Sequence, residues 1–489
     1  MESVVLWVYI ALLSVLLIYS IEALYLSMKF KKHFVDVKKN HTKTDFKNNL
    51  PLVTVQLPIF NEKYVVERLL KSIVALDYPK HLMEIQVLDD STDETKGLCE
   101  RLVEAYKNEG FDICHIHRVD RSGFKAGALK ESLDRAKGRF IAIFDADFLP
   151  RPDFLKETIS YFSEENVGLV QTRWEHINKD YSMITKAQAV ALDGHFVVEQ
   201  TARNLSGYFI NFNGTAGVWR KETIIDAGNW EADTITEDLD LSFRAQLKGW
   251  KFKYITDYHT PSELPVEINA LKSQQYRWTK GAVETAKKLL PSVWKSDLPI
   301  KTKLQCTYHL TNNLVYLAVF FIALLNLPLI YIKTHSSEYD MFFLVLSIFS
   351  VSFLGPFFMF YYSQKTVYEN WKSHLASFPV FLSGSMGLTV NNGKAVIDGI
   401  LGKKSPFIRT PKFNIFSSKD DFSTRSYKAK LSWVVIVEIL MTLYSFCSLS
   451  IAIINVELAA IPFHFMFFFG FLSISYLTVK HHFRYATIG

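Results

Sequence analysis

The sequence predicts an α/β domain with a parallel sheet, joined to a region of α-helices that cross a membrane. Between residues 51 and 300, short apolar runs alternate with stretches whose apolar residues recur at helical spacing, which is typical of a parallel sheet covered by helices on both faces. Apolar runs long enough to cross the roughly 30 Å of hydrocarbon in a bilayer lie before and after this segment. At 489 residues, of which 49% are hydrophobic and 15% aromatic, the chain has room for both parts.

The chain begins with a predicted membrane helix, residues 1–28, followed by a basic linker, residues 29–50. The apolar run starts at Val4, continues past Glu22 and ends near Met28. A cleaved signal peptide is the alternative, but no Lys or Arg precedes the run and no clear small-residue cleavage site follows it. Because lysines cluster directly after the span, the positive-inside bias predicts that the following domain is cytoplasmic.

Four further spans are predicted in two pairs, 308–362 and 431–489, and the second pair ends in a short cytoplasmic tail. The spans are Tyr308–Ile332, Met341–Tyr362, Leu431–Asn455 and Ile461–Leu477. Five crossings place every basic loop on one side, including the segment 363–430, which we interpret as cytoplasmic or interfacial. The stretch Phe378–Leu388 contains proline and glycine. If it crossed the membrane, the basic loops would no longer all lie on one side, so we interpret it as interfacial or re-entrant. We expect an integral protein of a plasma, inner or Golgi-type membrane.

The net charge of +6 does not indicate a nucleic-acid partner, because many of the basic residues cluster beside apolar spans. Basic residues in that position can bind anionic lipid, so the predicted partner is the bilayer. The four cysteines have neither metal-ligand nor disulfide spacing.

Asp89-Asp90 comes directly after the predicted strand Ile85–Leu88. Its carboxylates would be held at the carboxyl end of a strand, where parallel sheets bind ligands, and could accept hydrogen bonds from a base or a ribose. The alternative is an ordinary helix cap, since Ser91-Thr92-Asp93 is good capping chemistry.

Asp145-Ala146-Asp147 ends the predicted strand Phe140–Phe144. Alternate residues on an extended strand point the same way, so both carboxylates are expected to face one site. Two hard oxygen ligands suit Mg²⁺ or Mn²⁺, which takes its other ligands from water and phosphates and neutralises charge on a leaving diphosphate. The alternative is chance, because short Asp-x-Asp strings are common.

Lys125 lies at the start of the predicted helix Phe124–Arg135, where a diphosphate is favoured; the alternative is a solvated surface lysine. Thr236-Glu237-Asp238 precedes the predicted amphipathic helix Leu239–Leu247. A carboxylate there could remove the proton from an acceptor hydroxyl. The alternative is a Thr N-cap whose acidic neighbours complement the helix dipole.

The last motif is Gln274-Gln275-Tyr276-Arg277-Trp278, in a region where interfacial helices are predicted near residues 264–300. On a helix, Gln274 shares a face with Arg277 or Trp278. An indole stacks well on a sugar ring, and Arg stabilises phosphate charge. The alternative is an aromatic belt with basic anchors at the membrane interface.

Taken together, these motifs resemble those of the processive family 2 glycosyltransferases, the cellulose, mannan and hyaluronan synthases. The family pattern of Asp, Asp-x-Asp, Thr-Glu-Asp and Gln-x-x-Arg-Trp is complete and in order. Within the family, the chain is most similar to plant cellulose-synthase-like mannan and glucan synthases. Similar stretches are Val87–Asp93, Lys125–Lys130, Phe144–Phe148, Phe212–Gly217 and Leu247–Phe252. The resemblance implies a Rossmann-like GT-A domain over residues 51–300.

The resemblance also implies roles for the motif residues. Asp89 or Asp90 would hold the nucleoside, and Asp145 and Asp147 the nucleotide and the Mg²⁺ or Mn²⁺ ion. Asp238 would be the general base of an inverting displacement, and Gln274, Arg277 and Trp278 would hold the acceptor end and the diphosphate. Lys125 and Glu237 are predicted to contact substrate as well. Cellulose synthases carry a gating loop with Phe-x-Val-Thr; the nearest match, Phe407–Thr410 within residues 405–412, has Arg409 at the apolar position, so a phosphate-sensing loop is the alternative.

We therefore expect an enzyme that polymerises a hexose from UDP-glucose or GDP-mannose into a β-linked, β-1,4 polysaccharide and translocates it across the membrane. Its partners would be the nucleotide-sugar donor, the growing polysaccharide acceptor and the bilayer. The alternatives are a ceramide-type glycosyltransferase that adds one sugar to a membrane lipid, and a non-catalytic carrier with a relic sugar-binding domain. The sequence does not distinguish the two donors and does not predict an oligomeric state.

Overall fold

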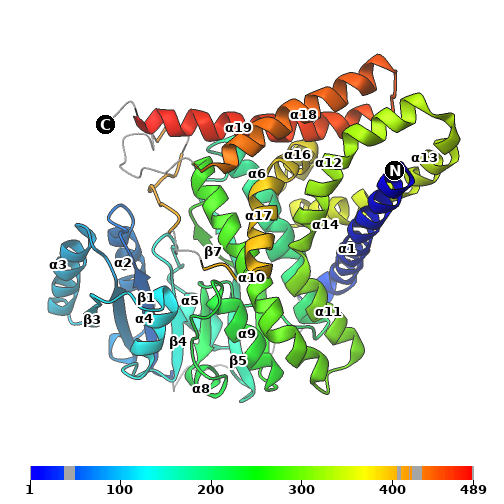
Figure 1. Cartoon of the computed structure of the whole chain (residues 1–489). Helices are drawn as coiled ribbons and strands as arrows, with labels where there is room; N and C mark the ends of the chain where they lie inside the picture. Colours follow the sequence, from blue (N-terminus) through cyan, green and yellow to red (C-terminus); the bar gives the residue numbers. More distant parts are fainter. Residues whose placement is uncertain (1, 38–49, 405–408, 418, 421–431, 487–489) are drawn as a thin grey trace.

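The computed structural model describes residues 2–37, 50–404, 409–417, 419–420 and 432–486. An α/β domain occupies one side of the molecule and a region of long helices the other, and the N-terminus lies in the helical region (Figure 1). The predicted combination of fold classes is therefore confirmed.

The α/β domain is built on one seven-stranded sheet in the order β3-β2-β1-β4-β6-β5-β7. The strands are β1 (Val53–Ile59), β2 (Met83–Asp89), β3 (Asp112–His117), β4 (Phe140–Ile143), β5 (Val167–His176), β6 (Gly217–Arg220) and β7 (Lys251–Ser262). Strands β3, β2, β1 and β4 are parallel neighbours, and β5 is parallel to β7.

The predicted parallel sheet has one exception, strand β6, which runs antiparallel to both β4 and β5. The cause is the loop before it, because the chain enters β6 at the edge where β4 ends. There the backbone N–H of Ala216 donates to the carbonyl of Ile143 at 2.9 Å. The sheet is therefore mixed, and the loop that reverses the chain lies beside the carboxyl end of β4.

Helices cover both faces of the sheet, as the alternating pattern predicts. They are α2 (Val66–Val74), α3 (Thr95–Asn108), α4 (Phe124–Leu133), α5 (Phe154–Ile159), α6 (Met183–Asp193), a π-helical turn η2 (Gly194–Glu199), α7 (Gln200–Leu205), α8 (Lys221–Asp226) and α9 (Glu237–Leu247). Successive residues of β4 enter opposite cores: Phe140 and Ala142 pack with α2, α3 and α5, whereas Ile141 and Ile143 pack with α4, α8 and α9.

The helical region follows β7 and also includes the N-terminal helix. Its members are α1 (Glu2–Val37), α10 (Ile268–Lys295), α11 (Ile300–Thr311), α12 (Leu314–His335), α13 (Asp340–Leu346), α14 (Leu354–Val367), α15 (Trp371–Leu375), α16 (Phe378–Gly387), α17 (Thr389–Ile400), α18 (Val434–Ile454) and α19 (Ile461–Ala486). Helix α16, in the stretch interpreted as interfacial or re-entrant, has 10 residues, too few to span a bilayer.

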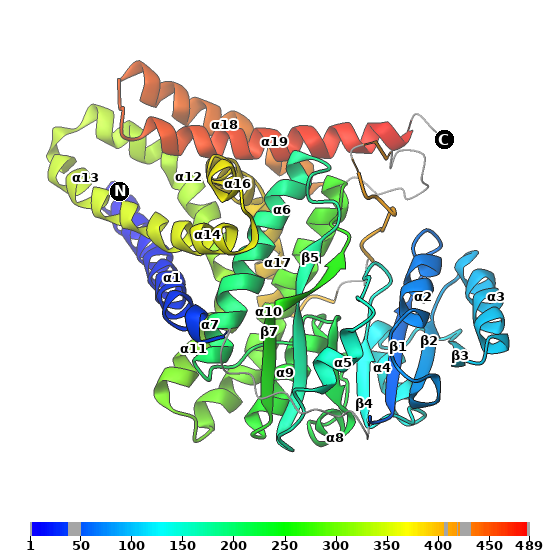
Figure 2. The same ribbon diagram turned by 180° about the vertical axis from the view of Figure 1, so that it is seen from behind.

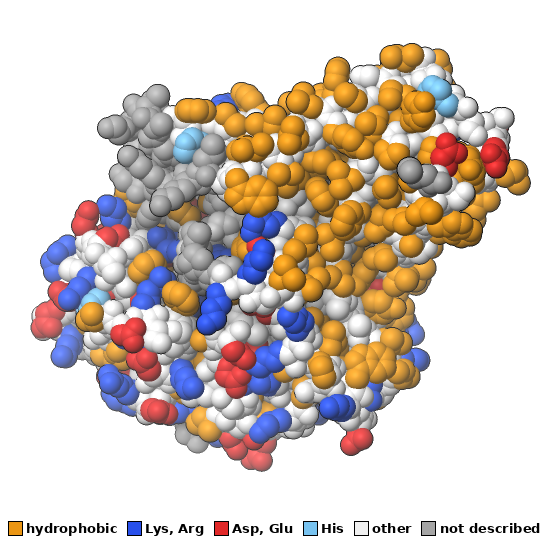
Figure 3. Space-filling model, viewed as in Figure 1, with side chains coloured by type: hydrophobic (Ala, Val, Ile, Leu, Met, Phe, Trp, Pro, Cys, Tyr) orange, Lys and Arg blue, Asp and Glu red, His pale blue; other side chains and the backbone are white. Residues whose placement is uncertain are grey.

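Five segments of the described chain are long and apolar enough to cross a membrane: Glu2–His33, Leu314–His335, Ser337–Val367, Val434–Ile454 and Ile461–Phe483. Hydrophobic side chains gather on the surface over α12, α18 and α19, whereas charged side chains gather over the α/β domain (Figure 3). By length and composition, these helices indicate a membrane protein, and their number agrees with the predicted crossings.

Helix α16 packs against α19 where two glycines meet. A Cβ on Gly387 would lie 2.3 Å from the carbonyl oxygen of Gly470, and a Cβ on Gly470 would lie 2.1 Å from the carbonyl oxygen of Ser383. Small residues permit such close helix contacts in membrane regions. Three residues before Gly387, an added Cβ on Gly384 would meet no atom within 4 Å.

Replacing Gly387 with Leu is therefore expected to destabilise the helical region by about 1–3 kcal/mol, because the backbones must separate. Gly384→Leu on the same helix is the matched control and is expected to keep the wild-type melting temperature. Thermal unfolding of the purified protein in nanodiscs measures both, and equal melting temperatures for the two variants would contradict this packing.

Candidate active site

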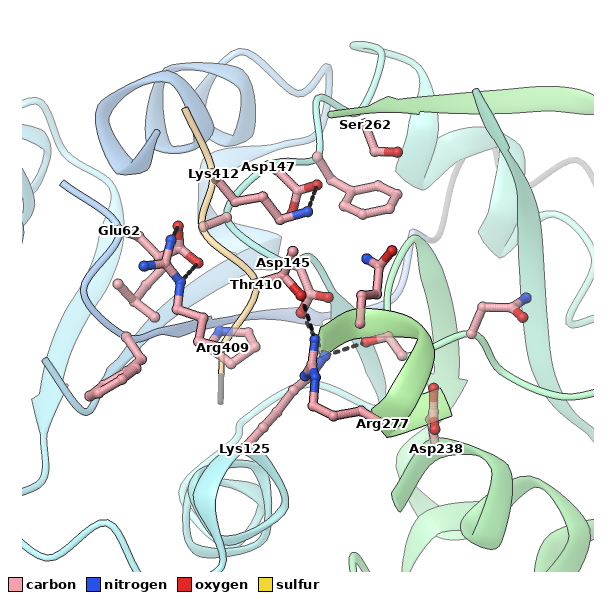
Figure 4. A pocket seen from close by; sticks show the side chains of 18 of the residues that line it. Glu62, Lys125, Asp145, Asp147, Asp238, Ser262, Arg277, Arg409, Thr410 and Lys412 are labelled. Atoms are coloured by element: carbon pink, nitrogen blue, oxygen red, sulfur yellow. Dashed lines mark hydrogen bonds and ion pairs between the residues drawn. The ribbon is translucent and has the colours of Figure 1, made fainter. Parts of the chain in front are cut away.

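A cavity of about 200 Å³ lies where β1, β2 and β4 end, between the α/β domain and α10 (Figure 4). All the predicted site residues except Asp89 line it: Asp90, Lys125, Asp145, Asp147, Glu237, Asp238, Gln274, Arg277 and Trp278. Motifs far apart in the sequence thus converge on one space, as the resemblance implies.

Asp89 and Asp90 have different surroundings, although they are neighbours at the carboxyl end of β2. Asp89 is fully buried; it accepts hydrogen bonds from the backbone N–H of Ser91 at 2.8 Å and pairs with His115 at 2.9 Å. Asp90 lines the cavity and accepts two bonds from the guanidinium of Arg118, at 2.8 and 2.7 Å. Of the two carboxylates, Asp90 is therefore the one placed to contact a ligand.

Asp145 and Asp147 both line the cavity, but they lie in a turn after β4, not on an extended strand. Each carboxylate is paired with a lysine ammonium. Lys125 Nζ donates to Asp145 Oδ1 at 2.5 Å, and Lys412 Nζ donates to Asp147 Oδ2 at 2.7 Å. The turn therefore brings both predicted metal ligands to the same cavity, and each carboxylate lies next to a positive charge.

The loop before β6 contacts both Lys125 and Asp145 and lies beside Asp238. Lys125 Nζ also donates to the carbonyl of Gly214 at 2.8 Å, and Thr215 Oγ1 accepts the backbone N–H of Asp145 at 2.9 Å. Gly214 has a φ of +80°, and a Cβ there would lie 3.0 Å from Asp238 Oδ2. Only glycine fits this position without strain and leaves room beside Asp238.

Glu237 and Asp238 form the first turn of α9, and Asp238 Oδ1 accepts the backbone N–H of Leu239 at 2.8 Å. Burial, followed by repulsion from Glu237, raises the pKa of Asp238 to about 7. Burial also tends to lower the pKa of Lys125, but the carboxylates of Asp145 and Glu237 raise it above its ordinary value. The cavity therefore combines a carboxylate poised to take a proton at neutral pH with a firmly charged lysine.

The raised pKa of Asp238 predicts a pH dependence. Below about pH 7 the carboxyl becomes protonated and can no longer accept a proton, so a transfer reaction that uses Asp238 as its base is expected to slow tenfold per pH unit on the acid side. A cation bound nearby shifts this limb to lower pH. Initial rates between pH 5 and 9 at saturating donor measure it, and a rate independent of pH over this range would contradict the predicted role of Asp238 as a base.

Helix α10 carries the last motif, and Gln274, Arg277 and Trp278 share the face that lines the cavity, as predicted. Arg277 Nη2 donates to Thr410 Oγ1 at 2.6 Å. Burial lowers the pKa of Arg277 to about 10, so its guanidinium stays charged at neutral pH. A positive, partly buried group thus lines the same cavity as the turn that holds Asp145 and Asp147.

The segment predicted to be a gating loop, or alternatively a phosphate-sensing loop, completes the cavity. Phe407 and Ile408 lie outside the described residues, but Arg409, Thr410 and Lys412 line the cavity. Arg409 Nε donates to Glu62 Oε1 at 2.7 Å, a pairing between residues 347 positions apart (Figure 4). Neither Glu62 nor Lys412 was predicted as a site residue. For Lys412, the sequence offered one indication, the presence of two basic residues, Arg409 and Lys412, three positions apart.

The sheet and its helical cover form a GT-A-like fold, with the carboxylate-lined cavity at one edge of the sheet. Residues 51–281 match the glycosyltransferase-like family 2. The mannosyltransferase PcManGT of Pyrobaculum calidifontis, solved in complex with GDP-Man and Mn²⁺, superposes with a TM-score of 0.58 at 18% identity, covering 82% of this chain and 100% of that one. At this identity the likeness concerns the fold.

Two relatives are more similar in sequence. Glucomannan 4-β-mannosyltransferase 2 of Arabidopsis thaliana is 42% identical over 251 residues, which cover 50% of this chain and 47% of the relative. Glucomannan 4-β-mannosyltransferase 1 of Oryza sativa subsp. japonica is 40% identical over 265 residues, which cover 53% of this chain and 51% of the relative. The chain thus spans about half the length of these relatives. The part of the chain that matches the family, residues 51–281, is thus similar to glycosyltransferase-like family 2.

Proposed function

We propose that this chain transfers mannose from GDP-mannose, with inversion, to the end of a β-1,4-linked polysaccharide. The observation that carries the proposal is the convergence of Asp90, Asp147, Asp238 and Arg277 on one cavity. The proposed linkage and sugar are supported by relatives named glucomannan 4-β-mannosyltransferase and by a structural neighbour solved with GDP-Man. UDP-glucose is the alternative donor.

Each side chain has a proposed task that follows from its position. Asp238 takes the proton from the acceptor hydroxyl as that oxygen bonds to the anomeric carbon. Lys125 and Arg277 both bring positive charge to the cavity and stabilise the departing diphosphate. Trp278 offers an indole face to the acceptor sugar, and Asp90 is placed to contact the nucleoside.

The turn after β4 fits Mg²⁺ or Mn²⁺, because it presents two hard oxygen ligands, Asp145 and Asp147, to one space. The ammonium groups that pair with both carboxylates indicate that this space favours positive charge. When bound, the cation supplies charge neutralisation at the diphosphate. The Mn²⁺ in the PcManGT complex supports this assignment.

We also propose that the α/β domain faces the cytoplasm. Lys29, Lys31 and Lys32 follow the apolar part of α1 directly, which fits the positive-inside bias. A cytoplasmic site would have access to nucleotide sugars. The identity of the membrane and the export of the product through the helices stay predictions.

Incubation of the purified protein in nanodiscs with each labelled nucleotide sugar tests the proposed activity. We expect incorporation from GDP-mannose into a product that β-1,4-mannanase degrades and cellulase does not. Asp238→Asn is the inactive control. Incorporation from UDP-glucose into a cellulase-sensitive product would assign the other donor, and the absence of transfer from every donor would overturn the proposal.

A further inference from the structure

A group of metal-binding side chains lies at the edge of the sheet, next to the end of the candidate active site where Asp90 lies. Asp89, Cys99 and His115 each offer one ligand atom, and these three atoms lie within 4.8 Å of one another. Asp89 ends β2, Cys99 belongs to α3, and His115 belongs to β3, the strand at one edge of the sheet. Seen from behind, α3 lies beside β3 (Figure 2). Because the group draws on three elements and contains a single cysteine, the sequence shows no metal-ligand spacing among its cysteines.

A second histidine faces the same carboxylate. His117 comes two residues after His115 on β3, so both side chains point to the same side of the strand. The register of β2 and β3 places His117 beside Asp89, and His117 Nδ1 lies 3.4 Å from Asp89 Oδ2. This nitrogen is buried and has no hydrogen-bond partner among the described residues. Buried polar atoms normally have a partner, so the nitrogen is free to bind a ligand.

The carboxylate of Asp89 is fully buried, and its two oxygens differ in their contacts. Oδ1 accepts the backbone N–H of Ser91 at 2.8 Å, whereas Oδ2 lies 2.9 Å from His115 Nε2. Within the part of the chain that the structure describes, no Lys or Arg pairs with Asp89. A buried carboxylate is normally paired with a cation or bound to a metal ion. Asp89 Oδ2 is therefore the oxygen available to a cation.

We propose that Asp89, Cys99, His115 and His117 bind a Zn²⁺ ion that fixes β3 and α3 to β2. One oxygen, one sulfur and two nitrogen atoms suit Zn²⁺, and structural zinc sites have four protein ligands in a tetrahedron. Mg²⁺ and Mn²⁺ prefer oxygen ligands, so a thiolate distinguishes this site from the one proposed for the active-site cation. Neighbouring ligand atoms of tetrahedral zinc lie roughly 3.3–3.6 Å apart. The contact between Asp89 and His115 would therefore have to open by about half an ångström.

The position of the site in the chain suggests what the ion does. Asp89 is followed by Asp90, and His117 is followed by Arg118, whose guanidinium donates to Asp90 at 2.8 and 2.7 Å. The backbone N–H of Arg118 also donates to the carbonyl of Asp89 at 3.0 Å. A metal ion that fixes Asp89 and His117 would thus hold in place the carboxylate that is proposed to contact the nucleoside. The zinc site itself does not depend on the proposed mannosyl transfer.

Co²⁺ is the probe that tests the site, because a thiolate bound to Co²⁺ gives an intense absorption band in the near ultraviolet. The carboxylates of Asp145 and Asp147 cannot give this band, since they offer no thiolate. Added to the full-length protein in nanodiscs after chelator treatment, Co²⁺ is expected to produce the band at one ion per chain, and Zn²⁺ to displace it. Cys99→Ala is expected to lose the band. Cys114→Ala is the matched control and should keep it, because Cys114 precedes His115 on β3 and points to the other side of the strand.

His117→Gln provides a second test that keeps the thiol. His117 is partly exposed, so the substitution should leave the fold intact. We expect it to raise the Kd for Co²⁺ at least about tenfold, since even a residue that only supports a metal ligand is worth that much. With excess Mg²⁺ present to occupy the active-site carboxylates, Zn²⁺ should raise the melting temperature of the wild-type protein by about 5 °C and that of Cys99→Ala by much less.

Three outcomes would overturn the inference. The absence of the band in the wild-type protein would mean that Asp89 and the two histidines form hydrogen bonds without a metal ion. A band of equal strength in Cys99→Ala would mean that another thiol binds the probe. An unchanged Kd in His117→Gln would exclude the proposed set of ligands. Because these measurements do not use turnover, they distinguish a failure of the zinc site from a failure of the proposed function.

Discussion

Replacing Asp238 with Asn is expected to abolish transfer while binding of GDP survives. The amide has nearly the shape of the carboxyl but cannot accept the hydroxyl proton, and loss of a general base costs roughly 10²–10⁴-fold in rate. The substitution should not weaken the fold. Because the pKa of Asp238 is raised from 3.8 to about 7 in the folded protein, the charged form is disfavoured there, and this group lowers the stability progressively as the pH rises from about 4 to about 7, with no further loss above that. Asn removes this charge, so its melting temperature at pH 8 should equal or exceed that of wild type.

Initial rates, GDP binding by calorimetry and melting temperature test this expectation together. Asp233→Asn is the matched control, since Asp233 is exposed, lies just before α9 and does not line the cavity. Retained turnover in Asp238→Asn would remove Asp238 from the mechanism. A joint loss of transfer, GDP binding and melting temperature would indicate a structural role instead.

Asp147→Ala is expected to abolish activity by weakening the binding of a divalent cation that transfer requires. A cation at a leaving diphosphate is worth several kcal/mol, which corresponds to a loss of about 100-fold or more. The variant also leaves Lys412, which donates to Asp147 at 2.7 Å, without this carboxylate. We expect the remaining activity to need a much higher concentration of Mn²⁺ or Mg²⁺.

Activity titrated with Mn²⁺ and with Mg²⁺, after treatment with a chelator, measures this effect. Asp134→Ala is the control, because Asp134 is exposed at the end of α4, outside the cavity. Full wild-type activity in excess chelator would contradict a role for the cation. If Asp147→Ala required the same metal concentration as wild type, the cation would have to bind elsewhere.

The sequence predicts those parts of the fold whose signal is local. Strands β2 and β4 were expected because buried parallel strands are short apolar runs, and the helix before β4 was expected because its apolar residues recur at helical spacing. Strand β3 was not predicted, since its residues Asp112–His117 include His and Asp and most are partly exposed. Strand β6 has four residues, too few for a pattern, and its antiparallel direction depends on a loop contact.

In the candidate site, too, the residues with a local sequence signal could be predicted and those that depend on distant contacts could not. The acidic motifs could be found because each follows a predicted strand or precedes a predicted helix. Sequence reasoning could not decide between Asp89 and Asp90, because one lines the cavity and the other is buried against His115, a contact made across strands. Nor could it find Glu62 or Lys412, whose partners Arg409 and Asp147 lie 347 and 265 positions away.

The proposed function requires that one cavity holds the nucleotide sugar. A cryo-EM structure of the full-length protein in nanodiscs with GDP-mannose, Mn²⁺ and the Asp238→Asn substitution tests it most directly. We expect the diphosphate between Arg277 and the turn of Asp145 and Asp147, with the sugar toward Trp278. A nucleotide bound outside this cavity, with these side chains in the positions seen here, would contradict the account.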